Sequence, residues 1–268
     1  MTAFALTPSR LRPFGLVQAH LLTLRKRRGL VLTVAAMTIG SQLVAYTTLI
    51  ALHAANASAH GPAGGTENLG NTVGVLSMLT TVAAILIGTS MAADDLSSGM
   101  FRELVVTGRS RKQLYYSRVP GGLALLLPLV VTAYAVSAVA SAALAGSKAA
   151  PSATLLAETG LWVIGVATFA YCLALGLATL VGSKTPVVGV LIGWTIAIAP
   201  LVAQISALGS GRDAIPYVAQ LHLLPHALQR TVGKTDVAMT SGTALTVLVL
   251  WAAFWLRAGL WRSVRREA

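Results

Sequence analysis

The sequence predicts an all-α protein with six helices that cross a membrane, and three observations support this fold class. Six mostly apolar stretches each hold about 20 or more residues, the length that an α-helix needs to cross a hydrocarbon core of ~30 Å. They are residues 30–54, 71–93, 119–146, 159–181, 186–208 and 237–256. Charged residues make up only 10% of the chain, against about 25% in soluble proteins. Positive charges are also concentrated on alternate connections, which predicts the orientation.

The distribution of Lys and Arg places both termini in the cytoplasm. Six of these residues precede the first stretch, five lie between the second and third, one lies between the fourth and fifth, and four follow the sixth. Only four lie on the other connections, and connections rich in Lys and Arg stay cytoplasmic. Each side carries four acidic residues, so the whole formal charge of +12 faces the cytoplasm. This basic face favours contact with anionic lipid over nucleic-acid binding.

The N-terminal segment, residues 1–29, is predicted to form an amphipathic helix on the inner leaflet. Its apolar residues recur at spacings of three and four, and Arg12, Lys26 and Arg27 fall on the opposite arc. Such a helix lies in the membrane interface with its apolar side in lipid. A solvated tail is the alternative.

The interiors of the six stretches contain no Asp, Glu, Lys or Arg. Ion-coupled transporters and intramembrane hydrolases usually need such groups as relays or ligands, so both classes are disfavoured. Gln42 and Tyr46 lie one turn apart on one face of the first stretch, and we predict that they line a substrate pathway. The other polar residues, such as Ser77 and Thr81, are expected mainly to serve helix contacts.

No metal or cofactor site is predicted on this chain. His222 and His226 have a spacing that suits a metal on a helix, but Pro225 intervenes and no nearby carboxylate completes a set of ligands. Residues 176–185 are similar to a phosphate-binding loop, yet the glycine spacing and the position of the lysine are wrong.

The connection at residues 94–118 carries the densest group of polar residues. Within it, Phe101, Leu104 and Val105 are spaced i, i+3, i+4, which predicts a short helix with one apolar face. Ser110 is suited to cap a second helix that runs into the third stretch. The apolar face favours docking to a soluble partner, and an ordinary basic loop is the alternative.

This connection resembles that of type-2 ABC transporter permeases, the membrane subunits of exporters whose ATPase is a separate protein. Such permeases typically carry here an acid followed by Gly-Thr, a Leu-rich apolar stretch and then Pro-x-Ser/Thr-Arg. The matching positions are Asp95 for the acid, Gly99 and Met100 for Gly-Thr, residues 104–106 for the apolar stretch and residues 108–111 for the last element. Met100 replaces Thr, and Gly108 replaces Pro. The six-span layout and the amphipathic N-terminus are also similar.

The resemblance implies that the connection forms a coupling helix in a cleft of the ATPase. Phe101 and Leu104 would pack in that cleft, with charged neighbours forming ion pairs at its rim. Burying one such apolar side chain contributes ~1.5–3 kcal/mol and an exposed ion pair ~0–1 kcal/mol, so the apolar pair should dominate docking. The expected partner-binding residues are Asp94, Asp95, Gly99, Met100, Phe101, Arg102, Glu103, Leu104, Arg109 and Arg111. ATP and Mg²⁺ would bind the partner and not this chain.

The segment at residues 209–236 is predicted to be helical and to lie on the outer side. Pro216 and Pro225 divide it, and Tyr217, Leu221 and Leu224 recur at spacings of four and three. The resemblance implies a helical hairpin that dips into the outer leaflet as an exit gate. A loop that rests on the membrane surface is the alternative.

The predicted organisation is a cytoplasmic segment at residues 1–29, a permease domain at 30–260 and a basic tail at 261–268. The expected function is ATP-driven efflux of a hydrophobic or amphipathic compound, such as a drug or a lipid-like molecule, across a bacterial cell membrane. The partners would be an ABC ATPase, membrane lipids and a second permease, either identical or similar. A membrane anchor or sensor that docks a cytoplasmic enzyme is the alternative. An embedded enzyme is disfavoured because no nucleophile–base set is visible.

Overall fold

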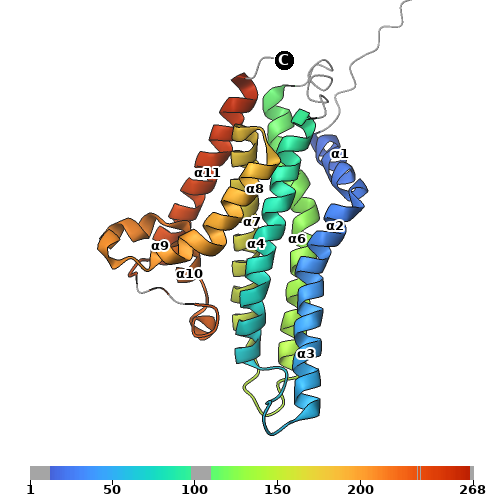
Figure 1. Ribbon diagram of the computed structural model, residues 1–268, viewed down its shortest axis with the longest axis vertical. Coiled ribbons are helices and arrows are strands. Elements are labelled where there is room, and N and C mark those ends of the chain that lie inside the picture. Colours follow the sequence, from blue (N-terminus) through green and yellow to red (C-terminus); the bar gives the residue numbers. More distant parts are fainter. Residues whose placement is uncertain (1–12, 98–109, 234, 236, 266–268) are drawn as a thin grey trace, which may run out of the picture.

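A computed structural model of the chain describes residues 13–97, 110–233, 235 and 237–265. Every regular element in these ranges is helical (Figure 1), so the predicted all-α fold is confirmed. Within the same ranges, six helical segments are long and apolar enough to cross a membrane. The chain is therefore a multi-pass membrane protein.

Four of the six segments contain one helix each, and two contain a widened turn. The single helices are α4 (Thr66–Ser97), α6 (Arg111–Ala143), α7 (Ala153–Val181) and α11 (Ser241–Arg265). The first segment combines α2 (Arg28–Ala35), the π-helical turn η1 (Ala36–Gly40) and α3 (Ser41–Ala55). The fifth combines α8 (Lys184–Ile192), the π-helical turn η2 (Gly193–Ile198) and α9 (Ala199–Ala203). A π-helical turn contains i→i+5 bonds and is often found at functional sites.

Several helix boundaries differ from those that hydropathy predicts. Helix α4 begins at Thr66, before the predicted residue 71, and α6 begins at Arg111, before the predicted residue 119. The Ser110 side chain accepts a hydrogen bond from the Gln113 amide at 3.2 Å, which confirms the predicted cap. Hydropathy misses these turns because polar residues also form helix once a cap satisfies the first free amides.

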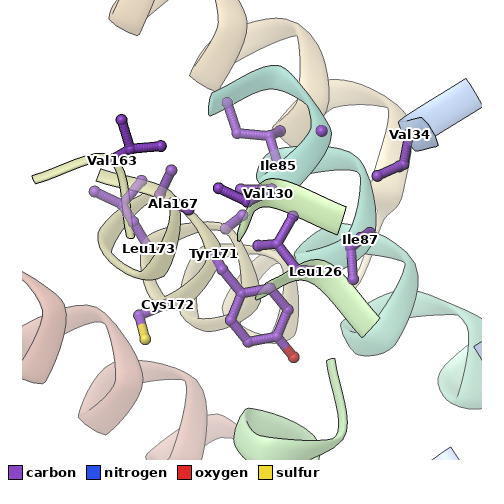
Figure 2. Packing of buried hydrophobic residues seen from close by; sticks show 14 of the residues in the cluster. Val34, Ile85, Ile87, Leu126, Val130, Val163, Ala167, Tyr171, Cys172 and Leu173 are labelled. Carbon is purple, nitrogen blue, oxygen red and sulfur yellow. The ribbon is translucent and has the colours of Figure 1, made fainter. Parts of the chain in front are cut away.

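Helices α4 and α7 form the centre of the bundle. In the most apolar 18-residue stretch of each helix, 72% of the residues of α7 and 56% of those of α4 are buried, against 11% for α11. Figure 2 shows Ile85 of α4, Leu126 of α6 and Tyr171 of α7 within one buried cluster. The remaining spans lie around this centre and leave much of their apolar surface exposed, as expected for helices that face lipid.

Glycines bring α7 into close contact with α4 and with α11. A Cβ atom at Gly88 of α4 would lie 2.9 Å from the carbonyl oxygen of Tyr171. A Cβ atom at Gly176 of α7 would lie only 2.3 Å from the carbonyl oxygen of Trp255 on α11. Both distances are too short for a side chain, so glycine permits the backbones to approach at these two points.

The predicted N-terminal helix is present as α1 (Pro13–Lys26). Part of its apolar side packs against the bundle, because Leu24 is buried and a Cβ atom at Gly121 of α6 would lie 2.8 Å from the His20 Cβ atom. The His20 Nε2 atom also lies 3.1 Å from the Ser117 hydroxyl oxygen. The position of α1 on a lipid surface stays a prediction.

The segment between α9 and α11 consists of three short helices, η3 (Ser206–Ala214), α10 (Pro216–His222) and η4 (His226–Leu228). In Figure 1, α9 and α10 lie level with the lower half of α4 and do not extend beyond its end. The indole Nε1 of Trp251, near the middle of α11, donates to the Ala214 carbonyl oxygen at 2.9 Å. This bond holds the segment alongside the spans. Its depth in a membrane stays a prediction.

Candidate functional site

Positive charges among the described residues gather at one end of the bundle, which we call the basic end. It comprises the end of α1, the start of α6, the start of α8 and the end of α11. Figure 1 shows the start of α6, the end of α11 and α1 at the same end of the bundle. The basic residues of these segments and of the start of α8 are Arg25, Lys26, Arg27, Arg28, Arg111, Lys112, Lys184, Arg262 and Arg265. The helix arrangement therefore agrees with the alternation of charge in the sequence. The cytoplasmic orientation of this end stays a prediction.

The structure describes only part of the predicted docking connection. Asp94 and Asp95 belong to the last turns of α4, and Arg111 begins α6. The Arg111 Nη1 atom donates to the carbonyl oxygen of Val264 on α11 at 3.2 Å. The other predicted contact residues lie outside the described residues; they are Gly99, Met100, Phe101, Arg102, Glu103, Leu104 and Arg109. Their role as a coupling helix stays a prediction.

Two buried tyrosines connect α6 to its neighbours near the basic end, and the sequence analysis did not single them out. The Tyr115 hydroxyl donates to the Leu256 carbonyl oxygen of α11 at 2.9 Å. The Tyr171 hydroxyl of α7 donates to the Arg118 carbonyl oxygen of α6 at 2.6 Å. A buried tyrosine hydroxyl usually has a hydrogen-bond partner, so the place of Tyr171 in an apolar stretch was the available signal, whereas Tyr115 lies in the predicted polar connection. These bonds join α6, α7 and α11.

Arg118 is a further difference from the sequence-based expectation. The predicted third stretch begins at residue 119, so the sequence places Arg118 in the connection and predicts no charged residue inside a span. In the structure Arg118 lies within α6 and is only 2% exposed. The buried part of α6 thus includes a guanidinium near the basic end, because α6 begins two turns earlier than hydropathy predicts.

Gln42 and Tyr46 occur together in a buried polar cluster between α3, α4 and α6. The Tyr46 hydroxyl donates to the Ser137 carbonyl oxygen at 3.1 Å and lies 3.2 Å from the Thr72 hydroxyl. It also hydrogen-bonds the Ser141 hydroxyl. The Ser137 hydroxyl donates to the Gln42 Oε1 atom at 2.7 Å. The pair holds three helices together here, and its predicted role in a substrate pathway stays a prediction.

A cavity of about 430 Å³ lies between α4, α7, η2, α9, α10 and α11. Ligand sites in proteins usually have volumes of ~300–1,000 Å³ and mostly apolar linings. Large apolar and aromatic side chains form much of the wall, namely Met78, Ile85, Trp162, Phe169, Leu173, Trp194, Tyr217 and Trp251. None of the described side chains that line it belongs to Asp, Glu, Lys, Arg or His. Its volume and its mostly apolar lining are therefore those of a ligand site.

One face of α4 forms the first wall of the cavity. Gly74, Ser77, Met78, Thr81 and Ile85 all line it, and their spacing of three and four places them along one side of a helix. From the sequence, the hydroxyls of this stretch are expected mainly to serve helix contacts. The structure instead places two of them at the cavity, which could be predicted only with knowledge of what lies opposite α4.

The widened turn η2 forms the second wall. Three consecutive residues, Trp194, Thr195 and Ile196, line the cavity. In a regular α-helix, three consecutive residues fan out over more than half of a turn, so η2 presents an unusually broad surface. A widened turn is associated with functional sites in other proteins.

Tryptophan side chains hold the segment after α9 against the other walls. The Nε1 atom of Trp162 on α7 donates to the Gln220 carbonyl oxygen of α10 at 2.7 Å. Gly70 of α4 permits contact with the chain that follows η4, because a Cβ atom there would lie 1.9 Å from the Thr231 hydroxyl oxygen. Burial raises the pKa of the Tyr217 phenol, so that side chain stays uncharged at neutral pH.

No protein-family model matches this chain, and a search of curated proteins gives no match either. Membership of a multi-pass membrane class follows from the six apolar helices.

Proposed function

We propose that this chain is the permease subunit of an ABC exporter, which moves an apolar or amphipathic molecule with energy from a partner ATPase. The observation that carries the proposal is the cavity of about 430 Å³ among apolar membrane-spanning helices. A protein that only anchors a partner has no need of a ligand-sized space among its spans. The resemblance of residues 94–118 to a coupling region supplies the type of partner.

The lining of the cavity supports an external energy source. Transporters driven by ions need ionisable groups beside the substrate as relays or ligands. The Tyr217 phenol is the only ionisable side chain in the described lining, and burial raises its pKa further from neutrality. The substrate site therefore lacks a group that could couple transport to protons near neutral pH, which favours energy delivered from outside the spans.

The contacts of α6 provide a route from the basic end to the cavity. Residues 98–109, which lie outside the described residues, connect α4 to α6. The start of α6 contacts α11 through Arg111 and Tyr115. Tyr171 connects the same part of α6 to α7. Because α4, α7 and α11 all line the cavity, a force applied to the connection would reach three of its walls.

The remaining parts of the proposal concern orientation and assembly. The basic end faces the cytoplasm, where the ATPase binds, and the cell is bacterial. A second permease subunit, identical or similar, completes the membrane part. Both inferences rest on the distribution of Lys and Arg and on the family resemblance.

The test is substrate-stimulated ATP hydrolysis by a purified complex. The chain is co-expressed with a candidate ABC ATPase from the same genome, and the complex is reconstituted in nanodiscs. We expect apolar compounds to raise the rate of ATP hydrolysis, and Phe101→Ala to weaken complex formation and with it the stimulation. Stable binding with a hydrolysis rate that no compound changes would favour the anchor or sensor alternative. Turnover by the purified chain alone would refute the proposal.

A further inference from the structure

We propose that each single chain holds a complete binding site for one uncharged, mostly apolar molecule that carries a hydrogen-bond donor. The site is the cavity between α4, α7, η2, α9, α10 and α11. All of its described walls are formed by helices and loops of this chain. The inference deepens the proposed function, because the bound molecule would be the exported substrate.

Charge determines the first property of the ligand. The described lining contains no carboxylate that could pair with a cation and no Lys or Arg that could pair with an anion. Moving an ion from water to an apolar site without a partner is costly. Both signs of charge are therefore excluded in favour of a neutral molecule.

The hydroxyl groups of the lining determine the second property. Four of the five lining hydroxyls donate their proton to a carbonyl of the preceding turn: Ser77 to Gly74 at 2.9 Å, Thr81 to Ser77 at 2.8 Å, Thr195 to Leu191 at 2.7 Å and Thr231 to Leu228 at 3.0 Å. A hydroxyl has one proton and two lone pairs. These four oxygens consequently offer a ligand acceptors only, so a ligand that bonds to them supplies the donor.

The indole groups strengthen this inference. Trp162 and Trp251 each have one N–H, and both groups already donate to backbone carbonyl oxygens of the lining segment, at Gln220 and Ala214. Two of the three lining tryptophans thus offer a ligand their apolar rings and no donor. Flat apolar molecules pack well against aromatic rings, which favours an aromatic or polycyclic body.

The opening of the cavity agrees with an uncharged ligand. Val75 and Met78 on α4 are each 49% exposed, and Trp194 and Ile196 on η2 are 39% and 37% exposed. All four line the cavity, so it opens between α4 and η2 at an apolar surface of a membrane span. A molecule that reaches this opening through lipid must cross hydrocarbon, which disfavours charged compounds.

The test uses the purified chain without any ATPase, in nanodiscs, with a matched series of pyrene probes. Energy transfer from the lining tryptophans to pyrene reports binding, and empty nanodiscs correct for partition into lipid. The series is pyrenemethanol, its methyl ether, pyrenylmethyl-trimethylammonium and pyrenesulfonate. We expect pyrenemethanol to bind at one molecule per chain. The methyl ether, which has no donor, should bind roughly 2- to 12-fold more weakly, the range that corresponds to one net hydrogen bond. The two ions should bind more weakly still.

Variants assign the acceptor. Thr81→Val and Ser77→Ala should each weaken pyrenemethanol binding and leave the methyl ether unchanged. The control is Thr48→Val, because Thr48 is an exposed residue of α3 that also donates to a carbonyl four residues earlier, at 2.8 Å. If one variant fails to fold, the other gives the result. The inference would be overturned if the trimethylammonium probe bound as tightly as pyrenemethanol, or if only half a molecule of pyrenemethanol bound per chain. It would also be overturned if a lipid acyl chain occupied the cavity and prevented the probe from binding, or if Thr81→Val and Thr48→Val had equal effects.

This experiment separates the inference from the proposed function. If the chain binds pyrenemethanol as described but gives no substrate-stimulated ATP hydrolysis with any ABC ATPase, the binding site is supported and the exporter function is refuted. If the complex exports compounds but the chain binds neutral and cationic probes equally well, the exporter function is supported and the inference about the ligand is refuted.

Discussion

Replacing Gly176 by alanine should push α7 and α11 apart and destabilise the fold. The added Cβ atom would lie 2.3 Å from the Trp255 carbonyl oxygen and 2.4 Å from the carbonyl carbon, whereas ordinary contact begins at 3.4 Å. The helices would have to separate by about 1 Å, since both obstructing atoms are backbone atoms that cannot rotate away. Overpacking of this kind costs ~1–3 kcal/mol, and alanine in a helix returns ~1 kcal/mol relative to glycine.

Gly165→Ala provides the matched control on the same helix. Nothing lies within 4 Å of a Cβ atom at Gly165, so this variant gains the helix propensity of alanine without a clash. The free energy of unfolding, measured by SDS titration in mixed micelles, should therefore be lower for Gly176→Ala than for Gly165→Ala by about 1–3 kcal/mol. Binding of pyrenemethanol should weaken only in Gly176→Ala, because α7 and α11 both line the cavity. Equal stability of the two variants would refute the packing of α7 on α11.

Three further predictions concern the polar cluster, the cavity and the undescribed connection. Tyr46→Phe should lower the free energy of unfolding, measured by SDS titration, by ~1–3 kcal/mol, because it leaves buried polar groups without their partner. The control, Tyr116→Phe, changes a side chain that is 56% exposed and should have little effect in that titration. Binding of pyrenemethanol should stay constant from about pH 6 to about pH 9, because burial raises the pKa of Tyr217 above its ordinary value near 10; a pH-dependent affinity in that range would show that a charged group faces the ligand. Phe101→Ala should weaken binding of the ATPase, measured by titration, by roughly 10- to 100-fold, as expected for the loss of ~1.5–3 kcal/mol, and Arg109→Ala by less than about tenfold; the reverse order would contradict docking through the apolar face.

The sequence was sufficient to predict the number of spans and the cap at the start of α6. Both depend on local signals, namely apolar length and a serine followed by free amides. It failed where polar residues continue a helix beyond the apolar stretch. Arg118, for example, is buried in α6 although hydropathy places it before the span.

The cavity could not be predicted, because its walls meet only in three dimensions. Ser77 and Thr81 look like ordinary packing residues until α10 and η2 are placed opposite α4. The widened turn at residues 193–198 has no strong local signature, since the sequence reads as a continuous apolar run. Gln42 and Tyr46 show the converse case, because two polar residues on one helix face can serve either a pathway or a contact with neighbouring helices.

The most direct test of the central claim is ATP-dependent flux in inside-out vesicles that contain this chain and its ABC ATPase. With ATP present, we predict that a pyrenemethanol-like neutral compound accumulates in the vesicle lumen, that accumulation stops when ATP is replaced by a non-hydrolysable analogue, and that it falls when Phe101→Ala is introduced. Accumulation by vesicles that contain this chain without the ATPase would contradict the account.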